Sequence, residues 1–257
     1  MTRTHNKHIR VYMDGVDLSG YSRTVGTLGW MFDSEPDAAI TDSVKNILMG
    51  RGDISAGPIN AFLDNDTAGL FVLAGSGTAT KGTRDVMIPI GANAAPAQGD
   101  PFFAWEFEQT SYMLEQGAGF VGVNVPMGGA SFDSSLTYKK PWGVMLHAKA
   151  AETAVNTAVG VDGGASSALG GIFVYHIFSS NGTVTIKAQD AATNTNPSFS
   201  DLSGATSGSV DATSAPKHGM IALSTTATVR QYTRWQLVFG TATTVTFACG
   251  LIRNTIA

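Results

Sequence analysis

The 257-residue chain is long enough to bury a sizeable core, and it carries little charge. Charged residues make up 14%, against about 25% in typical soluble domains, which favours a subunit covered by copies of itself over a freely diffusing monomer. The net charge of −4 and the lack of clustered Lys and Arg disfavour a surface that grips nucleic acid.

A single cysteine, Cys249, rules out an intramolecular disulfide and a zinc site built from cysteines alone. No uninterrupted run of about 18 apolar residues occurs, and no apolar segment follows the polar N-terminus. The sequence therefore predicts no membrane association and no secretion. It also gives no sign of a cofactor.

Residues 1–30 are predicted to form an N-terminal arm and an edge strand. Residues 9–13 suit a short strand, Asp14-Gly15 suits a tight turn, and the stretch up to residue 30 is extended and broken by glycines. An ordinary opening hairpin explains this pattern equally well. In an arm, three aromatic side chains could help it to add to the open sheet edge of a neighbouring copy: Tyr12, Tyr21 and Trp30.

Residues 34–50 carry the signals of one amphipathic helix. Ser34 can cap its first turn, Asp37 suits the positive end of the helix dipole, and Gly50 can end the last turn. Apolar residues recur at helical spacing and form one stripe, which we expect to pack on a sheet: Ile40, Val44, Ile47 and Leu48.

Residues 102–109 alternate between apolar and polar side chains, as a strand does. Glu106 and Glu108 fall on the same face, roughly 7 Å apart, a separation that also suits the acid and base of a glycosidase. Adjacent carboxylates on one strand more often mark a solvated face. We therefore interpret this pair as part of an acidic surface.

Catalytic motifs are missing from the sequence. The five histidines include no close pair with a carboxylate at metal-ligand spacing, and His147 and His176 lie in apolar runs that suit core residues. Neither a Gly-x-Ser-x-Gly elbow nor a phosphate-binding Gly-x-x-x-x-Gly-Lys loop occurs. The sequence therefore predicts that the protein is not an enzyme.

The last third of the chain predicts a series of strands. Residues 171–178 are apolar on both faces, Asn181-Gly182 suits a type I′ hairpin, and residues 183–189 alternate. Further strands are expected over 219–224, 232–239 and 243–252. The expected fold is mainly β: residues 31–257 form a single β-sandwich or β-barrel domain with one packed helix, long loops and insertions.

Five segments together form a characteristic arrangement of strand and loop sequences, four in the last third of the chain and one near the N-terminus: 183–186, 199–202, 230–235, 244–253 and 11–21. This pattern resembles the tail tube (major tail) proteins of long-tailed bacteriophages. The family also packs a helix against its β-sandwich.

The resemblance implies a structural virion protein that self-assembles into stacked rings and forms a tail tube. Its partners would be copies of itself and other tail proteins, and DNA would pass through without specific binding. The protein would be made in the host cytoplasm and end in the virion tail. An acidic lumen would let DNA slide, so Glu106 and Glu108 are the candidate lumen-facing residues.

Two other functions remain open. One is another virion role, such as a decoration or baseplate protein. The other is a non-catalytic, jelly-roll-like module that contacts carbohydrate or protein, for which exposed aromatic side chains would be the evidence, near Trp105, Trp142 or Trp235.

Overall fold

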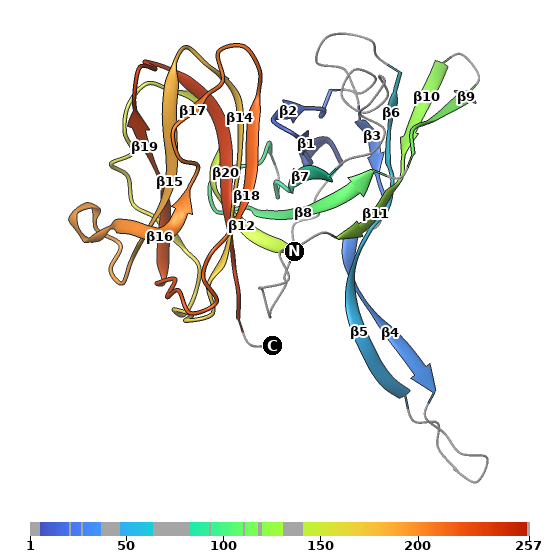
Figure 1. Ribbon diagram of the computed structural model, residues 1–257, viewed down its shortest axis with the longest axis horizontal. Coiled ribbons are helices and arrows are strands. Elements are labelled where there is room, and N and C mark those ends of the chain that lie inside the picture. Colours follow the sequence, from blue (N-terminus) through green and yellow to red (C-terminus); the bar gives the residue numbers. More distant parts are fainter. Residues whose placement is uncertain are drawn as a thin grey trace.

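The computed structural model describes most of the chain: residues 6–20, 22–26, 28–36, 47–63, 83–92, 94–109, 111–117, 120–130 and 141–255. Within these residues the protein is mainly β, as predicted, and its helices are limited to two short 3-10 turns, η1 (Asn6–His8) and η4 (Asn196–Ser198). The strands form four antiparallel sheets (Figure 1).

The largest sheet is strongly curled and runs through most of the molecule (Figure 1). Its strands lie in the order β18 (Lys217–Ala222), β14 (Gly171–Ser180), β20 (Val245–Arg253), β12 (Trp142–Glu152), β8 (Pro101–Gln109), β7 (Thr83–Pro89), β1 (Tyr12–Met13) and β2 (Val16–Asp17), and β11 (Met127–Ala130) also pairs with β8.

A second sheet packs on the C-terminal part of the curled sheet and completes a β-sandwich, as the sequence predicted. The side chains between them form one apolar cluster that includes Phe173 and Phe247 from the curled sheet and Ile186 and Leu237 from the second. The strands of the second sheet lie in the order β13 (Val161–Asp162), β19 (Tyr232–Phe239), β15 (Thr183–Ala191) and β16 (Ser200–Thr206), with β17 (Val210–Asp211) also paired to β15.

The predicted hairpin at Asn181-Gly182 is wrong, because the strands on either side of it belong to different sheets. Neither residue has the positive φ of a type I′ turn. The Asn181 side chain instead accepts backbone hydrogen bonds from Thr243 and Thr244. A Cβ on Gly182 would lie 2.6 Å from the Ala242 nitrogen, so glycine is needed here for close approach of the chain.

A third sheet covers the N-terminal part of the curled sheet. Phe103, Trp105 and Phe107 of β8 pack with Ile59 and Val123 of this sheet in a second apolar cluster. The strands lie in the order β3 (Ser22–Val25), β6 (Ile59–Phe62), β10 (Phe120–Val125) and β9 (Met113–Gly117). The curled sheet is therefore covered by one layer near each end of the chain.

The fourth sheet is a two-stranded ribbon made of β4 (Leu28–Pro36) and β5 (Ile47–Ala56), and it corrects the predicted helix. Ser34 pairs with Met49 and Pro36 pairs with Ile47, so both ends of the expected helix are strands. Residues 37–46 lie outside the described residues, and no packed helix is shown. The helical spacing within 34–50 was outweighed by strand pairing between residues 11 to 15 positions apart, which a search for helical periodicity does not test.

Polar contacts across the open side of the curled sheet join strands that are not neighbours in it. His218 of β18 donates from Nδ1 to Asp85 of β7 at 2.7 Å, and Lys149 of β12 pairs with Asp17 of β2 at 2.7 Å. Burial disfavours a charged imidazole, but the hydrogen bond to Asp85 and the charges of Asp14 and Asp85 together raise the pKa of His218.

His176 lies fully buried at the centre of this closure. Its Nδ1 accepts a hydrogen bond from the Gly15 backbone N–H at 3.1 Å, so the ring is neutral and its proton is on Nε2. Asp14 and Gly15 have φ values of 50° and 81°, as a type I′ turn requires, and this confirms the tight turn predicted there. Burial, reinforced by the charge of His218, lowers the pKa of His176 to about 3.

We expect acid to destabilise the protein through His176. The folded pKa is about 3 and the unfolded value is about 6.5, so between these values the unfolded chain binds the extra proton and stability falls as the pH drops. The slope for one proton approaches about 1.4 kcal/mol per pH unit. Burial also lowers the pKa of His147, which adds to this slope. The raised pKa of His218 has the opposite effect on stability. Protonated His218 stabilises the folded protein fully below a pH of about 6.5, and this stabilisation is lost as the pH rises.

Thermal melting between pH 4 and 7 checks this for the wild type and for His176→Asn, whose amide oxygen can accept the Gly15 N–H without titrating. The variant should show a smaller loss of melting temperature between pH 7 and pH 4 than the wild type. Equal pH dependence in the two proteins would contradict the role given to His176.

Candidate functional site

Strand β8 carries the two carboxylates predicted to face a lumen. Its residues alternate without a bulge against β7, so Glu106 and Glu108 lie on the face that also carries Ala104. Glu106 is half-buried and lies opposite Asp85, whereas Glu108 is exposed and lies opposite Thr83. The two carboxylates therefore share a face, in two different environments.

Glu106 is the more unusual of the two. Burial and the negative charge of Asp85 raise its pKa. Asp85 itself is held by His218, while neither glutamate forms an ion pair with another residue in the described part of the chain. The part of this face around Glu106 and Glu108 is therefore net acidic. That it lines a lumen stays a prediction.

The three aromatic residues predicted for the assembly arm lie in different environments. Tyr12 is 3% exposed, because β1 is inserted between β2 and β7, and its ring packs edge-on against Phe178 with centroids 5.0 Å apart. Its predicted contact with a neighbouring copy is therefore wrong, and it is a core residue. Trp30 lies in β4, paired with Ile54 of β5, and Tyr21 lies outside the described residues.

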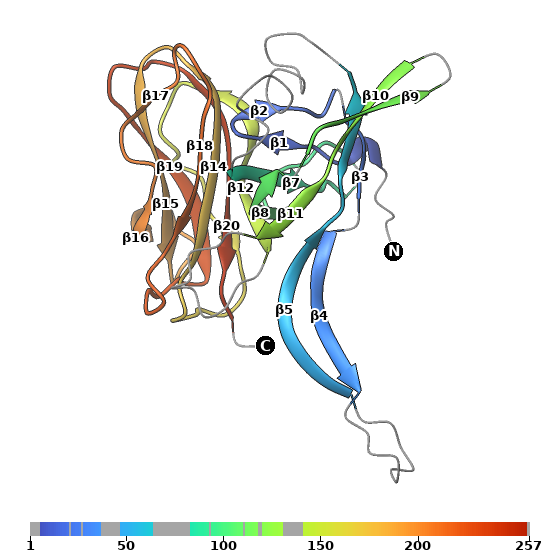
Figure 2. The same cartoon turned by 45° about the vertical axis from the view of Figure 1, so that its right-hand side comes forward.

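The β4–β5 ribbon is the feature best suited to contacts with another molecule. It projects from the body (Figures 1 and 2), and the outer edge of each strand pairs with no other strand among the described residues. An isolated two-stranded ribbon is only marginally stable in water, and its open edges can pair with other chains. The outer edges of this ribbon are therefore open to pairing with another chain.

The third sheet adds an apolar surface close to the ribbon. Strand β9 forms one edge of this sheet, and its described residues are exposed. Large apolar side chains between 39% and 60% exposed gather on β6, β9 and β10 and at their ends: Phe62, Leu63, Met113, Leu114 and Val121. The register places Phe62 and Met113 on one face of the sheet and Leu114 and Val121 on the other, so the sheet exposes apolar side chains on both faces.

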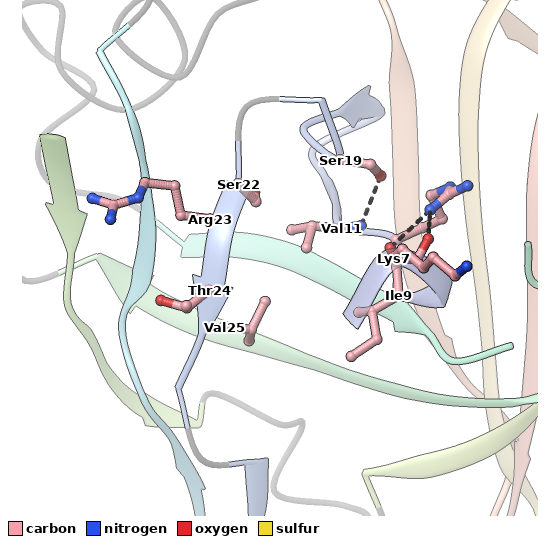
Figure 3. A pocket seen from close by; sticks show the side chains of 9 residues that line it. Lys7, Ile9, Val11, Ser19, Ser22, Arg23, Thr24 and Val25 are labelled. Atoms are coloured by element: carbon pink, nitrogen blue, oxygen red, sulfur yellow. Dashed lines mark hydrogen bonds between the residues drawn. The ribbon is translucent and has the colours of Figure 1, made fainter. Parts of the chain in front are cut away.

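A groove of about 360 Å³ separates β3 from the segment that precedes β1 (Figure 3). The side chains of Ile9, Val11 and Val25 point into it, and Lys7 lies on the side opposite β3. Among its nine described lining residues, three are basic and none is acidic, but the Arg23 side chain extends from the far side of β3 and its guanidinium lies over the Phe62 ring. We call this the basic groove, and define it by its lining residues: Lys7, Ile9, Arg10, Val11, Ser19, Ser22, Arg23, Thr24 and Val25.

Sequence reasoning missed the basic groove because its two sides are separated in the chain. The basic residues of the N-terminal segment were visible, but the signal for a shared groove is only that Lys7, Arg10 and Arg23 occur close together in an otherwise weakly charged sequence. Their common position depends on the pairing of Arg10 N–H with the Pro89 carbonyl and of β3 with β6.

The three tryptophans named for a carbohydrate-binding module differ in exposure. Trp105 and Trp235 are buried, whereas Trp142 is 42% exposed and lines a shallow pocket of about 310 Å³. The cationic residue of that pocket, Arg253, already donates to five backbone carbonyls: those of Gly163, Gly164, Ala165, Arg230 and Gln231. The pocket therefore offers an aromatic surface with little directed polar chemistry.

The described part of the chain shows no cluster of metal-ligating residues and no membrane-spanning helix. Within it, no group of three or more His, Cys, Asp and Glu residues is placed to hold a metal ion. None of its helices has the length and apolar character to cross a membrane. Buried His147 and His176 are core residues, as the sequence predicted.

Comparisons with known proteins find little. No protein family matches the chain, and no curated protein does. Among solved structures, the chain aligns with the SPP1 Dit (gp 19.1) protein, described as a paradigm of the hub adsorption apparatus in phages that infect Gram-positive bacteria. The alignment covers 95% of this chain and 98% of that one, with 12% identity and a TM-score of 0.30. A likeness this weak carries no argument about fold or function.

The raised pKa of Glu106 leads to a test of its environment. Because the folded pKa lies above the unfolded one, ionisation of Glu106 costs stability once the pH exceeds about 4.5, so Glu106→Gln should raise the melting temperature at pH 7 and leave it unchanged at pH 3. The gain should stay below about 1 kcal/mol, since the carboxylate is partly solvated. Glu108→Gln is the matched control, and an equal gain there would contradict a special environment for Glu106.

Proposed function

We propose that the protein is a structural virion subunit that self-assembles into stacked rings and forms a phage tail tube, through which DNA passes without specific binding. The proposed role is non-catalytic, its partners are copies of itself and other tail proteins, and its location is the tail of the virion. The observation that carries the proposal is the projecting β4–β5 ribbon, whose outer edges are unpaired among the described strands.

Three features support assembly from many copies. The ribbon is marginal unless another chain covers it. The third sheet presents clustered apolar side chains beside one open edge. Only 14% of the chain is charged, which suits a surface buried between subunits. The β-sandwich agrees with the tail tube pattern found in the sequence, and the acidic end of the β8 face suits passage of a polyanion.

The second candidate is a binding module, favoured by exposed Trp142 and its pocket. It leaves the ribbon and the exposed third sheet unexplained. Carbohydrate sites combine an aromatic surface with directed polar groups, and here the guanidinium of Arg253 is already bound by the backbone. The assembly proposal accounts for more of the molecule.

Self-assembly should be visible directly in negative-stain images of the purified protein as rings or tubes. A shortened variant replaces residues 33–51 by Asn-Gly, so that Phe32 and Gly52 flank a two-residue turn. This variant keeps the part of the ribbon nearest to the body. It should retain the wild-type circular dichroism and melting temperature but form no rings. Rings from the shortened variant would contradict the role of the ribbon, and monomers from the wild type would contradict the proposed function.

The position of the acidic face can be tested separately. Replacing Glu106 and Glu108 by Lys should leave ring formation intact and reduce DNA delivery in a reconstituted phage, because a basic wall attracts phosphates. Asp211→Lys, on an exposed position of β17, is the control with a charge change away from that face. Normal delivery by the double variant would show that these residues do not face the DNA.

A further inference from the structure

We propose that the curled sheet is hinged at the pairing of β8 with β12, and that a proton on His218 holds its opposite rim closed by joining β18 to β7 and to the β1–β2 turn. We call His218, Asp14 and Asp85 the latch. This inference does not depend on self-assembly. It requires a narrow connection between two parts of the sheet, a rim closed by side chains, and a closing group that changes its charge near neutral pH.

The curled sheet is continuous through one short seam. In the strand order, β12 and β8 are the neighbours that join the C-terminal strands to the N-terminal ones. Their register covers three residue pairs, with a few further backbone hydrogen bonds at the ends of the seam: Trp142 with Phe103, Gly143 with Phe102, and Val144 with Pro101. A change of angle between the two parts therefore disturbs fewer backbone hydrogen bonds here than in the longer ladder of β14 with β20.

Phe102 provides a pivot at this seam. Its ring lies against the backbone of Gly143 in β12 and of Gly250 in β20, where a Cβ on either glycine would collide with the ring. The ring is buried and belongs to the apolar cluster inside the curled sheet, together with Met145 of β12. Because these contacts lie at the seam, a small rotation moves them little and moves the opposite rim more.

Side chains close the opposite rim. Strands β18 and β2 are the two ends of the strand order, and no ladder joins them in the described part of the chain. His218 of β18 instead donates from Nδ1 to Asp85 at 2.7 Å, and its Nε2 lies 3.8 Å from Oδ1 of Asp14. The Gly15 N–H crosses the same rim to Nδ1 of His176 at 3.1 Å. A few side-chain contacts therefore do the work of a strand ladder.

His218 is placed to carry a positive charge. Both of its ring nitrogens face carboxylate oxygens, and the protonated imidazole has an N–H on each nitrogen. Burial opposes this charge, but the hydrogen bond to Asp85 and the charges of Asp14 and Asp85 raise the pKa of His218. The latch is therefore strongest below a pH of about 6.5, and it weakens as the pH rises through the raised pKa.

Charged and titratable groups surround the latch on every strand packed against it. Arg84 pairs with Asp14 at 2.8 Å, and His218 places its charge beside Asp85. When His218 loses its proton, the carboxylates of Asp14, Asp85 and Glu106 repel one another with less compensation. The groups that face His218 or Asp85 are Arg84 of β7, Asp14 of the β1–β2 turn, Glu106 of β8, and Tyr175 and His176 of β14, with Lys217 next to His218 in β18.

Buried His176 adds a cost to the closed rim. Its Nε2 is buried and has no hydrogen-bond partner, and water could satisfy this group when the rim opens. Burial and the charge of His218, whose ring centroid is 6.3 Å away, keep the pKa of His176 at about 3, so this ring stays neutral while the latch titrates. The edge-on contact of Tyr12 with Phe178 does not titrate and limits the opening. Release of the latch therefore loosens the rim without unfolding the sheet.

Opening would change the angle between the two covering sheets. The second sheet packs on the C-terminal strands through Phe173 and Phe247, so it moves with them. The third sheet packs on β8 through Phe103, Trp105 and Phe107, so it moves with the N-terminal strands. The protein is then one rigid body when His218 is protonated, and two bodies joined at the seam when it is neutral.

Hydrogen–deuterium exchange followed by mass spectrometry at pH 5.5 and pH 9 tests the latch, with rates corrected for the intrinsic pH dependence of exchange. The amides of residues 12–18 include the Gly15 N–H that crosses the rim. Their protection should fall roughly tenfold at pH 9, because charged hydrogen bonds are about twice as strong as neutral ones. Residues 247–251, within the ladder of β14 with β20, should keep their protection.

Two substitutions separate the charge of His218 from its shape. His218→Gln keeps a donor for Asp85 without a charge, so protection of residues 12–18 should be low at both pH values. His218→Arg keeps a charge throughout, so protection should be high at both. Lys149→Gln is the matched control: it removes the 2.7 Å contact with Asp17 at the same rim and should lower protection equally at both pH values, leaving the pH dependence in place.

The inference fails if the protection of residues 12–18 in the wild type does not change with pH, or if His218→Gln keeps the wild-type pH dependence. An equal loss of protection over residues 247–251 would show general unfolding and would also overturn it. The variant with the shortened ribbon should give the wild-type result. A monomeric wild type with a working latch contradicts the proposed function alone, and an assembling wild type without the pH dependence contradicts this inference alone.

Discussion

Two strands that bury apolar side chains on both faces determine the architecture. β14 packs Phe173 against the second sheet and Val174 toward the inside of the curled sheet. β8 packs Phe103 against the third sheet and Phe102 toward the inside of the curled sheet. Neither strand can leave a face in water, so the large sheet has to curl and take a covering layer near each end of the chain. The inner face is closed where the β1–β2 turn at Gly15 contacts buried His176 of β14.

Strands whose signal is local were predictable. The alternation of apolar and polar side chains over 102–109 and 183–189 predicted β8 and β15 almost residue for residue, because each strand has different neighbours on its two faces. The elements that failed depend on distant pairing. Residues 34–36 and 47–50 form strands because β4 and β5 pair with each other, and Asn181-Gly182 joins two sheets because residues 241–244 bind the turn. A search for local periodicity tests neither of these contacts.

The candidate surfaces were predictable only in part for the same reason. That Glu106 and Glu108 share a face follows from strand periodicity, but the burial and nearby Asp85 that set Glu106 apart come from a neighbouring strand. Tyr12 was expected at an exposed edge, yet β2 continues the sheet beyond it and the sheet closure buries its ring. The ribbon and the basic groove involve edges left open by the described pairing, which only the arrangement of strands reveals.

The chain has little charge, a projecting ribbon and exposed apolar side chains on its third sheet, and we propose that copies of itself cover these surfaces with one set of contacts. The mass of the purified protein in solution tests this claim most directly. Sedimentation equilibrium at micromolar concentration should give a particle whose mass is a fixed multiple of the 26.8 kDa subunit. A single species of 26.8 kDa at every concentration would contradict the account.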